Sequence, residues 1–265
     1  MNASEILHAG DLQASLKSLI EQVRKNPADL KLRIFLFQLY CVLGQWEKAL
    51  NQLQTLDQLD VTLWPMTQSY REIIRCELLR GEVFAGKKSP LVFGEPMEWI
   101  ALLLEAIALG AKGNHAESAQ LRQQALDTAV AISGTVDGER FAWMADADSR
   151  LGPILEVIIN GRYYWVPFQR IHSIEIIPPQ DLRDLAWVPA QFVWVNEGSS
   201  TGFIPTRYPG TENSDNDQLR LARRTEWLEI DADTFHGLGQ RLLTTDQNDY
   251  PIMDVREIQF EPSEG

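Results

Sequence analysis

The spacing of apolar residues changes once along this chain, and that change limits the folds open to it. Up to about residue 131 the apolar residues recur at the three- and four-residue spacing of an amphipathic helix. Beyond residue 153 they form short β-branched and aromatic runs separated by turn residues. We therefore predict an α+β fold, with a helical domain over residues 1–138 and a β-rich domain over residues 139–265.

The helical part carries a spacing typical of a repeat. Gly10-Asp11-Leu12 and Gly44-Gln45-Trp46 lie 34 residues apart, which is the period of tetratricopeptide helix pairs. Glycines and prolines interrupt the pattern between residues 60 and 98, so only the first and last units match it. We predict a tetratricopeptide-like domain, with helices over residues 12–25, 32–43 and from 46, a helix near 66–80, an irregular segment over 81–97 and a helix pair across 98–131.

The second part reads as short strands. Asn160-Gly161 is a two-residue hairpin signal between the apolar runs 154–159 and 163–168. Residues 207–218 are polar and rich in turn formers, which predicts a mobile loop. Many short strands favour a small antiparallel barrel or sandwich. Further strands are predicted over residues 171–177, 191–195, 226–230 and 252–260.

The net charge of −13 is concentrated in the second part. Residues 141–265 hold 20 acidic residues against 10 arginines and no lysine, which leaves a balance of −10. A surface this anionic repels phosphate backbones and anionic lipid headgroups. We therefore expect neither nucleic-acid binding nor membrane insertion, and we expect partners with neutral or basic protein surfaces.

Two further observations bear on location. The first residues lack the basic-then-apolar run of an export signal, and the longest apolar run, residues 99–109, contains Glu105 and is too short to span a bilayer. Cys41 and Cys76 lie in helix-patterned apolar segments, as packing residues in a reduced compartment do. We expect a cytoplasmic protein.

The sequence Asp146-x-Asp148-x-Arg150 places two carboxylates and a guanidinium at alternate positions. It resembles the start of a calcium loop, but Arg150 stands where the third ligand belongs. Arg150 would also lower the carboxylate pKa values, which does not suit a general acid. We interpret the motif as an ionic clasp that fastens the first β-hairpin to the helices. The predicted members of the clasp are Asp146, Asp148, Arg150, Glu156, Arg183 and Asp184.

The alternative from another class is a metal-dependent hydrolase that uses Asp146, Asp148 and Glu156. Residues 81–89 nearly match a phosphate-binding loop, but Lys88 replaces the hydroxyl that should bind magnesium. The histidines and cysteines lack metal-ligand spacing. We expect no catalytic residue, no metal and no cofactor.

Aromatic residues are dense in the second part, more so than an ordinary small core requires, so we expect some of them to be exposed. Exposed tryptophan and tyrosine beside arginine is the composition of binding hot spots. Stacked helix pairs also leave a concave groove that can receive an extended peptide or a helix. The residues that we predict to bind a partner are Phe35, Tyr40, Trp46, Trp64 and Trp99 in the helical groove, and Trp143, Trp165, Arg183 and Trp187 in the second domain.

Several segments together carry a resemblance to a known family. They are R-G-E-V-F-A-G (80–86), G-E-P-M-E-W (94–99), W-M-A-D-A-D-S-R-L-G-P (143–153), N-G-R-Y-Y-W-V-P-F (160–168) and D-L-R-D-L-A-W-V-P-A (181–190). In these segments the chain resembles the ImpE family, the TagJ/SciE-type accessory proteins encoded with bacterial type VI secretion systems.

The resemblance implies a cytoplasmic, non-enzymatic adaptor with a tetratricopeptide-like front domain. Such an adaptor would bind the small, TssB-like subunit of the contractile sheath through that subunit's N-terminal helix. It would also be linked to the ClpV-type AAA+ ATPase that recycles contracted sheath. The resemblance brings no catalytic residues. A secretion chaperone that holds an effector in the same groove is a further alternative.

Overall fold

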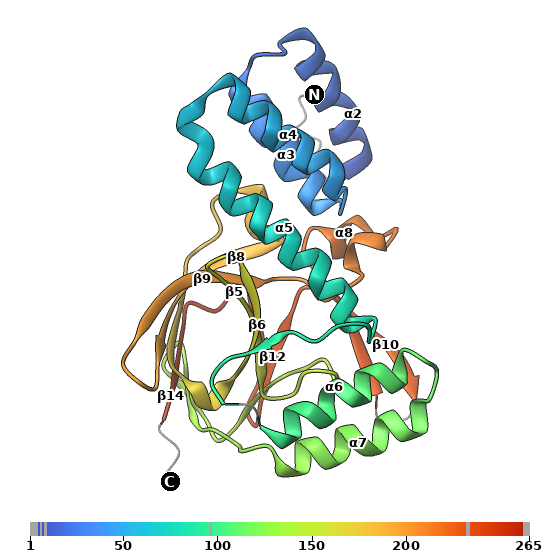
Figure 1. The fold of residues 1–265 in the computed structure, drawn as a ribbon, viewed down its shortest axis with the longest axis vertical. Coiled ribbons are helices and arrows are strands. Elements are labelled where there is room, and N and C mark those ends of the chain that lie inside the picture. Colours follow the sequence, from blue (N-terminus) through green and yellow to red (C-terminus); the bar gives the residue numbers. More distant parts are fainter. Residues whose placement is uncertain (1–4, 6, 8–9, 96, 232–233, 262–265) are drawn as a thin grey trace.

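The computed structural model of the chain describes residues 5, 7, 10–95, 97–231 and 234–261. Helices of the first part gather at one end, and α5 runs from them across the sheet toward a second helix pair (Figure 1). The α+β class is as predicted. The helices are α2 (Leu12–Lys25), α3 (Leu30–Val42), α4 (Trp46–Leu59), α5 (Trp64–Phe84), α6 (Glu98–Gly110) and α7 (His115–Thr128).

Side-chain caps and glycine turns set the ends of the first helices. Asp11 and Asp29 are the N-caps of α2 and α3, and their carboxylates accept hydrogen bonds from the backbone N–H groups of Ala14 and Leu32. Gly44 adopts a positive φ of 65° between α3 and α4, which permits the close turn that the spacing predicted. Helix α5 continues through Gly81 past the predicted end to Phe84, since a single glycine inside a helix costs only about 1 kcal/mol.

Among the residues that the structure describes, nine strands form one sheet, in the order β1-β6-β5-β9-β8-β7-β14-β2-β3. The two-residue turn at Asn160-Gly161 joins β5 and β6 as predicted, with φ angles of 49° and 68°. Strand β1 runs parallel to β6, and the other pairings are antiparallel. The strands are β1 (Leu91–Val92), β2 (Gly134–Val136), β3 (Glu139–Phe141), β5 (Ile154–Ile159), β6 (Arg162–Pro167), β7 (Ile171–Ile176), β8 (Trp187–Trp194), β9 (Ser199–Pro205) and β14 (Glu257–Phe260).

Two smaller sheets complete the β-rich part. One has the order β13-β12-β4, and the other pairs β10 with β11. Short helices also occur, among them η3 (Leu182–Leu185), η4 (Thr211–Asn213) and α8 (Asp217–Arg220), so the predicted polar loop over residues 207–218 contains helical turns. The strands are β4 (Met144–Asp146), β10 (Thr225–Asp231), β11 (Thr234–Gly239), β12 (Leu242–Thr245) and β13 (Asp249–Pro251).

Two sequence predictions need correction. In the part of the chain that the structure describes, the large sheet is open, because β1 and β3 end it without pairing to each other, so it is not a closed barrel. Only residues 257–260 of the predicted strand 252–260 pair as a strand, since residues 252–254 form a turn. The tetratricopeptide-like nature of the helices and the division at residue 138 stay predictions.

The large sheet is covered on both faces, which is why β5 is buried along its whole length. Ile154 and Ile158 pack with the helices, and Val157 and Ile159 pack in a second cluster with β7, β8 and β14. The first cluster also holds Trp165 and Trp187, so the helices and the sheet share one core. Among the described residues, no helix is long and apolar enough to cross a membrane.

Candidate functional site

Buried charged side chains meet where α5 packs against the sheet. Arg80 of α5 donates from Nε to Glu156 Oε1 at 2.7 Å and from Nη2 to Oε2 at 2.9 Å. Arg241, between β11 and β12, donates to both Glu156 and Asp146. The side chains of Asp146, Glu156 and Arg241 are fully buried. We call these four residues the ion-pair network.

Two tyrosines complete the hydrogen bonding of the ion-pair network. The Tyr163 hydroxyl donates to Glu156 and accepts from Trp165 Nε1 at 2.8 Å. The Tyr208 hydroxyl donates to Asp146 Oδ1 at 3.0 Å. Buried carboxylates are stable only when such partners replace water. The network therefore joins α5 to β4, β5 and the connection between β11 and β12, and each of its carboxylates has hydrogen-bond donors.

The environment shifts the pKa values of the two carboxyl groups of the network in opposite directions. Burial alone would raise the pKa of Glu156, but Arg80 and Arg241 lower it to about 2. Burial raises the pKa of Asp146 to about 6, and the nearby charges of Asp148 and Glu156 add to this against the single cation Arg241. Glu156 is thus held as an anion.

Asp148 belongs to a second, adjacent set of contacts. Its carboxylate accepts from Arg150 Nε at 2.8 Å and from the backbone N–H of Gly237 in β11 at 2.8 Å. Burial opposes ionisation of Asp148, but Arg150 keeps its pKa below the ordinary value. The Arg150 guanidinium lies 4.8 Å from the Phe84 ring at the end of α5. This set therefore links the turn after β4, the strand β11 and α5.

Four of the predicted clasp residues fall in these two sets, and Asp148 pairs with Arg150, which the clasp interpretation also named. Asp146 and Glu156 pair with Arg80 and Arg241, which the sequence interpretation did not name. Asp184 lies apart, in η3. There it accepts backbone hydrogen bonds from Gln180 and Asp181 at 2.8 and 2.9 Å, while Arg183 pairs with Asp181.

This arrangement does not support the hydrolase alternative. Arg241 bridges Asp146 and Glu156, and Asp148 is held by Arg150, so each carboxylate of the proposed triad already faces a guanidinium. Within the described ranges, no group of three or more His, Cys, Asp or Glu residues is placed to hold a metal ion.

The predicted partner-binding aromatics divide by exposure. Trp64 is 56% exposed and Trp143 is 40% exposed. Phe35 and Trp46 are half-buried and pack against the core, where the Trp46 and Trp187 rings lie 5.8 Å apart. Arg183 stacks 4.4 Å from the Tyr70 ring. The predicted residues that lie buried in the core, and offer no surface in this structure, are Tyr40, Trp99, Trp165 and Trp187.

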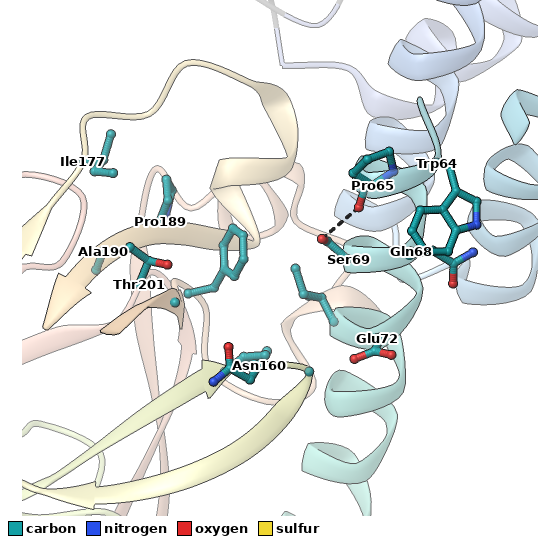
Figure 2. Close-up of a pocket in the computed structure, with 15 residues that line it drawn as sticks. Trp64, Pro65, Gln68, Ser69, Glu72, Asn160, Ile177, Pro189, Ala190 and Thr201 are labelled. Carbon is teal, nitrogen blue, oxygen red and sulfur yellow. Dashed lines mark hydrogen bonds between the residues drawn. The ribbon is translucent and has the colours of Figure 1, made fainter. Parts of the chain in front are cut away.

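A hollow of about 510 Å³ lies between α5 and the sheet, beside exposed Trp64. Figure 2 shows Trp64, Gln68 and Glu72 along α5, opposite Ala190 and Thr201 of the sheet. We call this hollow the α5 groove. Its lining residues are Trp64, Pro65, Gln68, Ser69, Glu72 and Ile73 of α5, Ile158, Asn160 and Gly161 of the β5–β6 hairpin, and Ile177, Pro189, Ala190, Thr201, Gly202 and Phe203.

The fold and these sites define an α+β protein in which the conspicuous acids form internal ion pairs and a groove of mixed polarity lies between α5 and the sheet. The family described as ImpE protein matches residues 138–259. The type VI secretion system accessory component TagJ of Pseudomonas aeruginosa is 49% identical over 266 residues, covering all of this chain and 93% of that protein.

Comparison of structures agrees with the sequence comparison. The crystal structure of protein VPA1032 from Vibrio parahaemolyticus superposes with a TM-score of 0.90 at 26% identity, covering 98% of this chain and 97% of that one. The chain belongs to the ImpE/TagJ family of type VI secretion accessory proteins.

Proposed function

We propose that this protein is a non-enzymatic, cytoplasmic adaptor of a type VI secretion system. In this proposal it binds the N-terminal helix of the small, TssB-like sheath subunit, and through that subunit it is linked to the ClpV-type ATPase that recycles contracted sheath. Membership of the family supports an accessory role. The paired state of Asp146, Asp148 and Glu156 supports a role in binding over one in bond chemistry.

The observation that carries the proposal is the α5 groove with Trp64 at its edge. A tryptophan side chain that is 56% exposed leaves a large apolar surface in water. Its neighbours Pro65 and Ile73 line the same groove from α5, and Phe203 lines it from the sheet. A groove with this apolar lining suits one face of an amphipathic helix, whose side chains project at helical spacing.

The charge at the groove indicates what the helix should carry. Glu72 is the single charged residue among those that line the α5 groove. The protein as a whole has a net charge of −13. A helix with apolar anchors and a nearby lysine or arginine therefore fits better than an acidic helix, since the charges also steer association.

Isothermal titration calorimetry with a synthetic peptide of the sheath subunit's N-terminal helix tests the proposal. We expect saturable binding to the full chain. Trp64→Ala should weaken binding about thirtyfold, because removing a tryptophan that anchors an interface costs about 2 kcal/mol of binding free energy. Trp64 is exposed and makes few core contacts, so the variant should fold normally.

Trp143→Ala is the matched control, since Trp143 is also an exposed tryptophan but does not line the α5 groove. It should bind the peptide as the unaltered chain does. Absence of binding heat at high peptide concentration would refute the adaptor proposal, and equal weakening by both variants would refute the assignment to the groove. Addition of the ClpV-type ATPase to the complex of this protein with the peptide then tests whether the ATPase binds that complex.

A further inference from the structure

In the described part of the chain, the edge of the β10–β11 hairpin that is hydrogen-bonded to the body of the protein is that of β11. On the far side of β11, Gly237 donates to Asp148 at 2.8 Å, and Gly239 donates to Thr211 at 2.9 Å. Phe235 exchanges hydrogen bonds with Ser149, at 3.0 Å through the serine hydroxyl and at 3.1 Å between the backbones. β11 is therefore fixed, and β10 is the outer strand.

The outer edge of β10 has no strand partner in the described part of the chain. β10 pairs with β11 residue by residue over residues 225–229, and a bulge follows between Glu229 and Asp231. Its sequence TEWLEID contains no lysine or proline, two residues that proteins place on edge strands to prevent pairing with another chain, so its protection rests on that bulge and on its acidic side chains. The unbulged edge over residues 225–229 is a template for strand addition by a segment whose charge complements those acids.

The hairpin also gathers exposed apolar side chains. Trp227 is 38% exposed, Leu228 48% and Phe235 39%. Trp227 is held in place by Tyr208, whose ring lies 5.6 Å away and occupies the space that a side chain at Gly237 would need. The exposed apolar surface is therefore presented by a strand fixed from behind.

Charge selects the partner for this edge. Successive side chains of a strand alternate between faces, so Glu226 and Leu228 lie on one face and Trp227 and Glu229 on the other. Glu226 pairs with Arg224 at 3.2 Å and accepts from the Asn216 side-chain amide at 3.5 Å, but the Arg224 side chain is 63% exposed, so this ion pair contributes little. Each face thus combines one acid with one large apolar residue.

We propose that the free edge of β10 binds an extended segment of a partner protein that carries a basic-apolar-apolar-basic sequence. Such a segment would add an antiparallel strand, with cations opposite Glu226 and Glu229 and apolar residues opposite Trp227 and Leu228. This is a second site, separate from the α5 groove, and its occupant is a strand instead of a helix.

The same pattern disfavours a second copy of this chain as the occupant. Antiparallel pairing of two β10 strands about the Trp227–Leu228 bond would place Glu226 of each copy opposite Glu229 of the other. Like charges directly opposite each other destabilise a strand pair. The net charge of −13 on each copy adds to this repulsion.

Hydrogen–deuterium exchange of the full chain with two short peptides tests the proposal. One peptide has a Lys-Val-Val-Lys core, and the other has the same length with Glu-Val-Val-Glu. We expect the lysine peptide to slow exchange of the backbone amides over residues 226–229. The glutamate peptide should bind about tenfold more weakly or not at all, because its acids face Glu226 and Glu229.

Two protein variants test whether the slower exchange comes from binding at the edge of β10. Leu228→Lys places a cation on the edge and should abolish the protection, whereas Leu78→Lys changes an equally exposed leucine of α5, 48% in each case, and should not. Trp64→Ala should also leave the protection of residues 226–229 intact, so the proposal for this site and the proposal for the α5 groove can be refuted independently. Equal protection by both peptides, no protection by either, or protection of the peptide-free chain that grows with its concentration would overturn the proposal.

Discussion

At the scale of single residues, Glu156 shows how this protein accommodates a buried charge. Three side chains, those of Arg80, Arg241 and Tyr163, donate hydrogen bonds to its carboxylate. Removing one partner from a buried ion pair leaves an uncompensated charge and costs about 3–5 kcal/mol of folding free energy. We therefore interpret the ion-pair network as a joint between α5 and the sheet.

The Glu156→Gln variant should lose stability less steeply in acid than the unaltered chain. The pKa of Glu156 is about 2 in the folded protein, against an ordinary value of 4.5, so its contribution to stability is present above pH 4.5 and is lost as the pH falls toward 2. In urea unfolding, the free energy of unfolding of the unaltered chain should fall by about 3 kcal/mol more than that of the variant as the pH is lowered across that window.

The control for the pH prediction is Glu175→Gln, which alters an exposed glutamate of β7. Its stability should fall with pH as that of the unaltered chain does. If the Glu156→Gln curve also ran parallel to the unaltered one, the assignment of a strongly lowered pKa to Glu156 would be wrong.

The sequence could predict only the local part of this site. Asp148 and Arg150 are two residues apart, so their pairing follows from local geometry. Arg80 lies 76 residues from Glu156, and Arg241 lies 85 residues from it, so their meeting depends on the tertiary fold. The absence of lysine after residue 140 was the available hint, because arginine is the better residue for paired carboxylates.

At the scale of elements, the sequence predicted those features that depend on residues close together in the chain. The helix from residue 12 and the Asn160-Gly161 turn are set by neighbouring residues, and the structure contains both. The sheet order is different, since β14 pairs between β7 and β2, and β1 pairs with β6 across long stretches of chain. No pattern in one sequence specifies those pairings.

Gly161→Ala should destabilise the chain more than Gly138→Ala. Both glycines have a positive φ, 68° and 87°, which costs an alanine about 1 kcal/mol. A methyl group at Gly161 would also meet the Glu72 carboxylate, which can rotate away, and would lie 3.1 Å from the Glu72 Cβ, which moves only with α5, whereas nothing lies within 4 Å at Gly138. Thermal unfolding of both variants measures the difference, and equal melting temperatures would show that the hairpin does not press on α5.

At the scale of the whole molecule, the helices and the sheet bury residues in common. Trp165 and Trp187, from strands, belong to the same core as residues of α3, α5 and α6. The ion-pair network crosses the same boundary through Arg80. The predicted division into residues 1–138 and 139–265 therefore separates groups that depend on each other for burial.

A fragment of residues 139–265 should not fold stably by itself. Its Tyr163, Trp165 and Trp187 side chains, which are at most 1% exposed in the full chain, would lose the helices that cover them. We expect the fragment to expose apolar surface and to lack a cooperative thermal transition, whereas the full chain should unfold in one. A sharp transition in the fragment would instead support two independent domains.

We propose that this protein acts by binding a helix in the groove between α5 and the sheet. Hydrogen–deuterium exchange of the full chain, with and without the intact small sheath subunit, tests this. We expect slower exchange over residues 64–73 of α5 and 158–161 of the β5–β6 hairpin, which line the groove. If the subunit bound and left both segments unprotected, the helix would bind elsewhere.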